Sequence, residues 1–496
     1  MLSLSMIVKN EEKYLWDCLN SVNGVVDEIV LIDTGSTDNT KKIAEEFGAK
    51  IYDYKWKNDF SESRNYALEK ANGDWILYLD ADERLTENSK DELKKITNVE
   101  GKKAFHCRII NVDEISNHPS VMSYVRLFAK KPGIQFTGKI HEQIEDSLVN
   151  NGYKIEQSSI EIIHLGYNLS KDDLKLKAKR NLDILIKEYG NKKNGYTAFQ
   201  IGQSLHILER EDDAVKYFEE SVKDNSLRNE YKATAYRSLA INSAENLDLD
   251  SATKFIDLSI KYDRHQPLSL LAAAKIYLKG SKLVAAIGFV KEALKYNRDY
   301  ATGRRVSSQN ILIDPKVIIY NGLTISLMSN DLKSVNLFLE ELKNTATHVE
   351  YSFYENLINK KNILLKDDEL KSIINNDNYE LLFIAGNQYP DKSMIMKITK
   401  VVVDKFLNNS SFLNKYGLVL LENSLEIEAE KILERSLELN PHELSSVFYL
   451  ISVYIKQNAI DKISIIINRY RPYFEVHPTL LSKLIDLEQK LTDFSR

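Results

Sequence analysis

Short apolar runs separated by helical patterns mark the first part of the chain. Four such runs occur, at residues 2–8, 28–33, 51–54 and 75–79. Each has the length of a β-strand, and the run at 75–79 is apolar throughout, which is typical of a parallel strand buried on both faces. Helical spacing follows the first run through Leu15, Leu19 and Val22, and a second helix is expected from about residue 41 to residue 47. The pattern predicts a parallel sheet covered by helices.

Two of these runs end in acidic residues. Asp33 ends the second run, and Asp80-Ala81-Asp82 follows the fourth. The carboxyl ends of parallel strands meet at the edge where open α/β sheets bind ligands. Divalent cations prefer oxygen ligands and are often shared with substrate phosphates, so Asp80 and Asp82 could hold a metal that bridges a nucleotide diphosphate. Acids also occur at strand ends for structural reasons, and spacing alone leaves both interpretations open.

Three segments of the same region, taken in order, carry a resemblance to a known family. They read SMIVKNEE, EIVLIDTGSTDNT and SRNYALEKANGDWILYLDADE. The series resembles the nucleotide-sugar half of family-2 inverting glycosyltransferases of the GT-A fold, and the resemblance covers residues 1–167. It implies an α/β GT-A domain that binds a nucleotide sugar.

The resemblance also implies roles for single residues. Asp33 would contact the uridine of a UDP-sugar, and Arg64 would lie near the nucleotide. Asp80 and Asp82 would bind Mg²⁺ or Mn²⁺, with Asp82 the more direct ligand and Asp80 also close to the nucleotide sugar. The loop after the first strand would lie along the nucleotide through Lys9, Asn10 and Glu11.

One position departs from the family pattern, and simpler roles exist for some of these residues. Many relatives carry a second acid or an asparagine directly after the acid at position 33, whereas this chain has Thr34. The resemblance therefore supports base contacts in this loop less firmly than it supports the other roles. Asp33 and Ser36 also fit a helix-capping turn, and Arg64 also fits a surface cation.

The acceptor side of the domain is expected from about residue 105 onwards. Residues 105–112 and 124–130 read as strands. The segments RLF, GKIHE and IIHLGY are similar to a subgroup of these transferases that carries helical repeats behind the catalytic domain. Inverting transfer needs a general base that takes the proton of the acceptor. We expect Glu142 to be that base, with His141 as the alternative.

A third metal ligand is expected from the chain that returns past the sheet. The resemblance makes His164 the candidate for this position. The alternative for both His141 and His164 is that they are ordinary histidines at strand ends, hydrogen-bonded to the backbone.

Behind residue 167 the pattern is helical and repetitive. A linking helix is expected in residues 168–195, with an apolar stripe along one side. Small residues then recur at spacings of 12 and 7, at Gly202, Ala214 and Ser221, at Ala240, Ala252 and Ser259, at Ala274, Ala286 and Ala293, and at Gly417, Ala429 and Ser436. This pattern is typical of tetratricopeptide repeats, in which small residues allow the two helices of a pair to approach closely. We therefore expect repeats in residues 196–300, degenerate helical repeats in 301–400 and C-terminal repeats in 401–496.

The composition of the chain argues against several classes of protein. With 67 basic and 72 acidic residues the net charge is -5, which provides no broad basic surface for nucleic acid. Two cysteines exclude a disulfide scaffold, and Cys18, Cys107 and His106 lack zinc-site spacing. No apolar run is long enough for a transmembrane segment, and the first strand begins too early for a signal peptide. We expect a cytoplasmic enzyme.

The function expected from the sequence is transfer of a hexosyl or N-acetylhexosaminyl group to a peptide or protein. The resemblance points to bacterial transferases that glycosylate Ser, Thr or Cys, including peptide S-glycosyltransferases of modified bacteriocins and flagellin glycosyltransferases. The repeats would recruit the polypeptide acceptor or form a homodimer. Two alternatives stay open: a transferase of lipopolysaccharide or capsule assembly, and a repeat scaffold with an inactive transferase domain.

Overall fold

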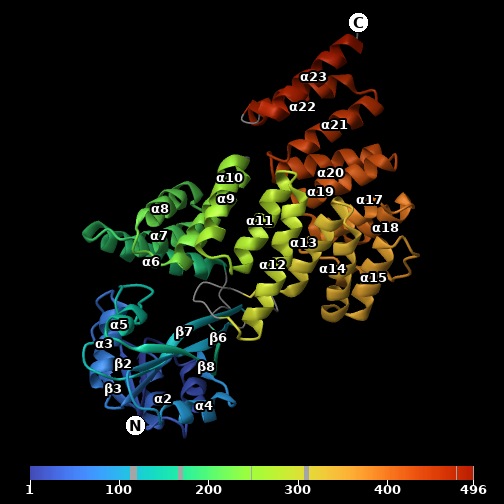
Figure 1. Ribbon diagram of the computed structural model, residues 1–496. Helices are drawn as coiled ribbons and strands as arrows, with labels where there is room; N and C mark the ends of the chain where they lie inside the picture. Colours follow the sequence, from blue (N-terminus) through green and yellow to red (C-terminus); the bar gives the residue numbers. More distant parts are fainter. Residues whose placement is uncertain (112–119, 166–170, 247, 306–311, 476–477, 495–496) are drawn as a thin grey trace. The chain divides into compact units, whose positions relative to one another are not determined.

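The structure is a computed structural model in which two units are distinguished (Figure 1). It describes residues 1–111, 120–165, 171–246, 248–305, 312–475 and 478–494. The first unit holds residues 1–280 and 292–314, and the second holds residues 281–291 and 315–496. The boundary expected at residue 167 lies outside the described residues.

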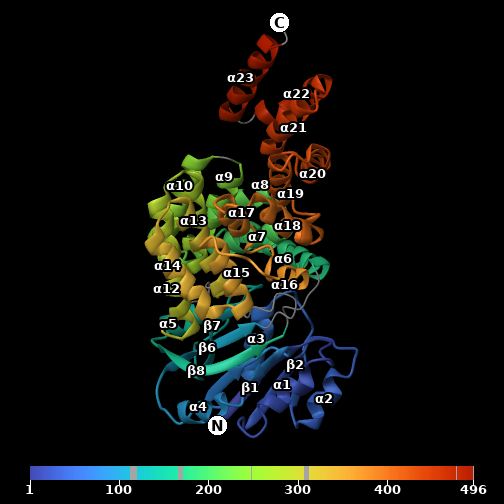
Figure 2. The same ribbon diagram turned by 90° about the vertical axis from the view of Figure 1, so that its right-hand side faces the viewer.

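A mixed sheet of eight strands forms the N-terminal domain (Figure 2). The strands are β1 (Leu2–Val8), β2 (Glu28–Asp33), β3 (Lys50–Asp53), β4 (Trp75–Tyr78), β5 (Glu83–Leu85), β6 (Lys103–Asn111), β7 (Ser120–Ala129) and β8 (Lys154–His164). Their order is β3-β2-β1-β4-β7-β6-β8-β5. β1 to β4 are parallel as expected, whereas β7 runs antiparallel to β4 and β6, and β5 runs antiparallel to β8.

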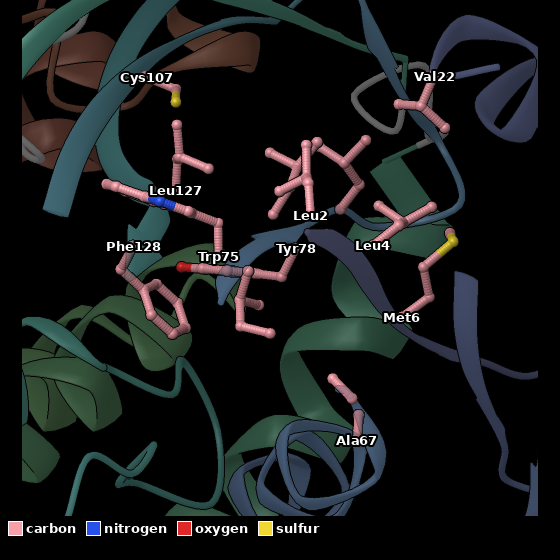
Figure 3. Close-up of a cluster of buried hydrophobic side chains, with 14 of the residues drawn as sticks. Leu2, Leu4, Met6, Val22, Ala67, Trp75, Tyr78, Cys107, Leu127 and Phe128 are labelled. Carbon is pink, nitrogen blue, oxygen red and sulfur yellow. The ribbon is translucent and has the colours of Figure 1, made fainter. Parts of the chain in front are cut away.

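The core of this domain forms around the central strands because both of their faces are covered. β1 lies between β2 and β4, and its side chains Leu4 and Met6 have no exposed surface. Figure 3 shows them in one cluster with Trp75 of β4 and Phe128 of β7. The covering helices are α1 (Leu15–Ser21), α2 (Thr40–Glu46), α3 (Phe60–Lys70), α4 (Ser89–Ile96) and α5 (Glu145–Asn150). An α/β domain of GT-A type is thus confirmed.

In the described residues that follow the sheet, the regular elements are helices. In the first unit they are α6 (Lys171–Asn191), α7 (Gly195–Ile207), α8 (Glu211–Lys223), α9 (Asn229–Glu245), α10 (Leu249–Tyr262) and α11 (Pro267–Lys279), and α12 (Leu283–Ala301) contributes to both units. The second unit continues with α13 (Pro315–Met328), α14 (Leu332–Thr345), α15 (His348–Ile358), α16 (Asp367–Ile373), α17 (Tyr379–Asn387), α18 (Lys392–Val402), a 3₁₀ turn (Val403–Phe406), α19 (Ser410–Glu422), α20 (Glu426–Leu439), α21 (Leu444–Lys456), α22 (Ile460–Glu475) and α23 (Pro478–Phe494). The linking helix expected in residues 168–195 corresponds to α6.

Equivalent hydrogen bonds recur in two separate repeats. Ser259 Oγ donates to the carbonyl oxygen of Ala233 at 2.7 Å, and Ser436 Oγ donates to that of Ser410 at 2.8 Å, each 26 positions back. Both serines also contact a serine ten positions further on, at 3.0 and 3.2 Å. The helical region is therefore tetratricopeptide-like, as its small-residue spacing indicates.

Close helix approach explains why glycine stands at the repeated small positions Gly202 and Gly417 and also at Gly322 of α13. Each of these glycines faces a large side chain 16 positions later, in the pairs Gly202 and Phe218, Gly322 and Phe338, and Gly417 and Leu433. A Cβ atom added to any of them would lie 2.5 to 2.7 Å from that side chain. The pairs place the larger residue of one helix directly against the backbone of its partner helix.

The Gly322→Ala substitution should destabilise the protein because the new methyl group overlaps the ring of Phe338, which is completely buried. Overpacking of this kind lowers the free energy of unfolding by about 1–3 kcal/mol. Gly288→Ala on α12 is the matched control, since nothing lies within 4 Å of its added Cβ. That control should gain about 0.5–1 kcal/mol from helix propensity. Urea unfolding measures the free energy of unfolding of both variants. An increase for both variants would contradict the close approach of the two helices.

None of the helices in the described ranges is both long and apolar enough to cross a membrane.

Candidate active site

The carboxyl ends of three parallel strands lie next to each other at one edge of the sheet. The register pairs Val8 of β1 with Asp33 of β2, and Ser5 of β1 with Tyr78 of β4. Asp80 and Asp82 follow directly after β4. The acids that the sequence places at strand ends therefore lie at the edge that binds ligands in α/β sheets.

Asp33 is a buried carboxylate with one oxygen satisfied by the protein. Its Oδ1 accepts hydrogen bonds from the backbone N–H groups of Gly35 and Ser36, both at 2.9 Å. Its Oδ2 is buried and has no hydrogen-bond partner among the described residues. Asp33 thus caps the turn after β2, whereas the expected capping of the helix is wrong, because α2 begins at Thr40 with Asn39 as its N-cap. A buried acceptor without a donor is costly, so a donor supplied by a ligand would stabilise Oδ2.

Backbone and side-chain hydrogen bonds join the loop after β1 to the loop after β2. The Asn10 N–H donates to Ser36 Oγ at 2.9 Å, and Asn10 Oδ1 accepts from the Thr37 N–H at 2.8 Å. The Glu11 N–H donates to Thr40 Oγ1 at 2.7 Å. Asn10 itself has a positive φ of 56°. The two loops therefore form one preformed edge next to Asp33.

In the loop after β1, one charged side chain faces solvent and another faces the acids that follow β4. Lys9 is exposed. Burial, together with the charges of Asp82, Asp80 and Asp38, raises the pKa of Glu11 to about 7. The Glu11 carboxyl therefore shares the negative field of the acids that follow β4.

The pairing of β5 with β8 brings His164 next to Asp82. The register places Glu83 opposite His164, and the Leu165 N–H donates to the carbonyl oxygen of Asp82 at 3.0 Å. His164 Nε2 then lies 3.2 Å from Asp82 Oδ2. Its Nδ1 lies 2.7 Å from Asn111 Oδ1, which orients the ring. Although burial disfavours the charged ring, the Asp82 carboxylate raises the pKa of His164.

Arg64 connects the carboxylates of Asp80 and Glu142. Its Nη2 donates to Asp80 Oδ1 at 2.7 Å, and its Nε donates to Glu142 Oε1. The Arg64 side chain is 7% exposed and is therefore not a surface cation. Burial opposes ionisation of Asp80, but the guanidinium groups of Arg64 and Arg126 hold the pKa of its carboxyl well below its usual range. The acid after β4 and the expected base are thus linked through one buried cation.

Arg126 and Glu83 belong to the same buried network and were not identified from the sequence. Arg126 Nη2 donates to Glu83 Oε1 and lies 3.6 Å from Asp80 Oδ2. Both guanidinium groups lie over the ring of Tyr78, at 4.6 Å for Arg126 and 5.0 Å for Arg64. A sequence signal existed for Arg126, because it is a lone cation inside an apolar strand. Its partners could not be known without the fold.

The expected metal ligands are only partly brought together. Asp82 and His164 meet, whereas the carboxylate of Asp80 is bonded to Arg64. Across the ranges that the structure describes, no group of three histidine, cysteine or acidic side chains is arranged to hold a metal. Cys18 and Cys107 are both buried, and burial raises the pKa of both thiols above its usual range.

The histidine proposed as the alternative base lies in a turn and not at a strand end. His141 has a positive φ of 53°, and its side chain is exposed. Glu142, the next residue, has a side chain that is 14% exposed and points to Arg64. Of the two candidates, Glu142 is the one joined to the acidic site.

A mixed sheet with paired acids at its strand ends, followed by tetratricopeptide-like helices, defines a GT-A domain joined to a repeat region. Residues 3–144 match the family described as glycosyl transferase family 2. The N-terminal domain of this protein is a glycosyltransferase domain of that family.

Two proteins and one solved structure are similar to parts of this chain. The SPbeta prophage-derived glycosyltransferase SunS of Bacillus subtilis (strain 168) is 26% identical over 368 residues, which cover 71% of this chain and 85% of SunS. A TPR repeat-containing protein of Synechococcus elongatus is 40% identical over 148 residues, which cover 30% of this chain and 36% of that protein. The crystal structure of S. aureus TarS matches with a TM-score of 0.31 and 15% identity, over 51% of this chain and 54% of TarS.

Proposed function

We propose that this protein is an inverting, metal-dependent glycosyltransferase that moves a sugar from a UDP-sugar to a Ser, Thr or Cys side chain of a peptide or protein. The observation that carries the proposal is the chain of contacts from Asp80 through the buried Arg64 to Glu142, next to the Asp82–His164 pair. It joins a carboxylate suited to base catalysis to the strand edge that would hold the donor.

Asp33 supports binding of a nucleobase at this edge. Its buried Oδ2 has no donor within the described part of the chain, and an N–H group of the base would supply one. A hydrogen bond to a charged group contributes about 1.5–3 kcal/mol. Uracil carries such an N–H, so the proposal assigns the donor as a UDP-sugar. Lys9, Asn10 and Glu11 would lie along the nucleotide in the joined loops.

Asp82 and His164 fit a divalent cation such as Mg²⁺ or Mn²⁺. A carboxylate oxygen and an imidazole nitrogen converge at 3.2 Å, and Asn111 fixes the ring through the other nitrogen, as an outer ligand partner does in metal sites. Asp80 is the neighbouring acid. The bound metal would offset the negative charge that develops on the diphosphate leaving group.

Glu142 is the proposed general base. Its Oε1 is held by Arg64, and its Oε2 has no protein partner within the described ranges, so one oxygen is oriented while the other can accept a proton. The acceptor oxygen or sulfur would bond to the anomeric carbon as the bond from that carbon to the diphosphate oxygen breaks. The acceptor proton passes to Glu142, and the diphosphate leaves with the electron pair.

The repeat region supports a polypeptide acceptor. Arrays of helix pairs form extended surfaces that bind peptides and protein subunits. The nucleotide sugar would bind at the sheet edge, so the array is free for another role. We therefore assign the helices to recruitment of the acceptor.

Intact-mass measurement tests the proposal. The protein is incubated with Mn²⁺, a panel of nucleotide sugars and peptides that contain Ser, Thr or Cys, and the Asp82→Ala variant serves as the blank. The expected result is a peptide heavier by one hexosyl or N-acetylhexosaminyl residue, formed from a UDP-sugar. Transfer to glycan acceptors alone would favour lipopolysaccharide or capsule assembly. Absence of turnover with every donor would favour an inactive transferase domain on a scaffold.

A further inference from the structure

The segment from Thr137 to Gln143, which we call the base loop, is a closed turn that carries Glu142. Thr137 and Gln143 exchange two backbone hydrogen bonds, at 2.9 and 2.8 Å. Within it His141 has a φ of 53°, a left-handed conformation that is unfavourable for residues other than glycine. Such a conformation persists where surrounding contacts impose it.

The first repeat helices supply an apolar anchor for the base loop. Ile140 is 3% exposed and belongs to a cluster whose other buried members come from α6 to α9 and the turn before α9. Leu182 of α6 and Phe199 of α7 are among them. The base loop is therefore packed against the repeats as well as against the sheet domain.

Tyr196 of α7 supplies a polar clamp on the same loop. Its hydroxyl donates to the carbonyl oxygen of His141 at 3.0 Å and accepts from Gln143 Nε2 at 3.1 Å. These two residues flank Glu142 on either side. The hydroxyl thus bridges the loop across the residue whose side chain points to Arg64.

The loop also borders a cavity on the side of Tyr196. Thr137, Gly138 and Gln143 line a cavity of about 370 Å³ together with Tyr196. Because no side chain packs into this space, the backbone can relax towards it when the clamp is removed. The hydrogen bonds of Tyr196 oppose such a movement, together with the packing of Ile140.

We propose that Tyr196 is a positioning residue for Glu142, so that the first repeat completes the catalytic site. This inference rests on the proposed role of Glu142 as the base. Tyr196 itself does not touch the substrate. It holds His141 in its left-handed conformation and thereby sets the direction of the Glu142 carboxylate.

The test compares Tyr196→Phe with Tyr189→Phe in the full chain. The first variant keeps the ring, which packs against Tyr231 at 5.1 Å, and loses the clamp. The control loses the hydroxyl of a tyrosine that packs against the same cluster but donates to Glu220. Small displacements of catalytic groups are costly, so we expect Tyr196→Phe to lower kcat for UDP-sugar turnover about tenfold while KM changes less than twofold. The control should match the wild type.

A double variant separates positioning from a general loss of structure. If Tyr196 acts through the Glu142 carboxylate, Tyr196→Phe should have no further effect on kcat in a Glu142→Gln background. If the two substitutions instead lower kcat by the product of their separate effects, the inference is wrong. Equal kcat for Tyr196→Phe and Tyr189→Phe, with Glu142→Gln impaired, would also overturn it and leave the proposed function intact.

Hydrogen exchange provides a readout that does not depend on turnover. The amides of the base loop should exchange at least tenfold faster in Tyr196→Phe than in Tyr189→Phe. Unchanged exchange would refute the clamp. Full activity of Glu142→Gln would instead remove the base assignment on which the inference rests, and the exchange rates would still decide the clamp itself.

Discussion

Replacement of Glu142 by glutamine is expected to lower kcat about 100- to 10,000-fold while the affinity for the nucleotide sugar stays within a few-fold. The amide keeps an oxygen that can accept from Arg64 Nε, so the geometry should persist while the ability to take a proton is lost. Steady-state kinetics of transfer, with calorimetric binding of UDP, measure the two effects separately.

Two controls make this result specific. Glu161 of β8 lies outside the proposed site, and its carboxylate accepts a hydrogen bond from Arg108 of β6 at 2.7 Å. Glu161→Gln should therefore leave kcat unchanged. His141→Ala tests the alternative base. If that variant loses kcat and Glu142→Gln does not, the two roles must be exchanged. A cysteine acceptor should show a smaller loss than a serine acceptor, because a thiol is partly ionised near neutral pH.

Removal of the Asp82 carboxylate is expected to abolish metal-dependent binding of the donor. Loss of the partners that orient a ligand already costs about 10- to 100-fold in metal affinity, and loss of a ligand itself should cost at least as much. Asp82→Ala should therefore bind UDP equally with and without Mn²⁺, and a chelator should stop turnover by the wild type. Calorimetry with UDP at increasing Mn²⁺ measures the effect, and thermal unfolding checks the fold.

Asp74→Ala is the matched control for the metal experiment. Asp74 lies directly before β4, at the opposite end of the strand from Asp82, and pairs with the chain amino terminus at 3.0 Å. It should bind the donor as the wild type does. His164→Ala should weaken the metal requirement in the same direction as Asp82→Ala. Full turnover in excess chelator would refute metal dependence, and an unchanged metal requirement in His164→Ala would return that residue to a structural role.

The sequence predicted the structure best where a feature depends on residues that are close together in the chain. Apolar runs predicted β1, β2 and β4 to within one residue at each end, because a strand covered on both faces needs mostly apolar side chains. The edge strand β3 was also predicted to within one residue, although its Lys50 and Asp53 are exposed. The acids after β2 and β4 were expected at one edge since parallel strands end together. Repeated small residues predicted helix pairs because only a small side chain fits beneath Phe218 or Phe338.

Contacts over long sequence separations were decided by the tertiary structure. Asp82 and His164 are 82 positions apart and meet through the antiparallel pairing of β5 with β8, which no local pattern specifies. Arg64 and Glu142 are 78 positions apart. Their ion pair forms because the fold places the guanidinium group of Arg64 over the ring of Tyr78, next to Asp80. The family resemblance pointed to each of these residues but could not determine which of them form pairs.

The sequence by itself determined which segments are strands or repeat helices and which acids stand at strand ends, since apolar periodicity and residue size act over a few positions. The tertiary structure alone decided that Asp80 is bonded to arginine while Asp82 meets His164, and that Tyr196 of a repeat helix holds the loop of Glu142. The physical reason is that hydrogen bonds and ion pairs depend on distances of about 3 Å. Such distances follow from sheet register and helix packing, which are set by the whole core and not by neighbouring residues.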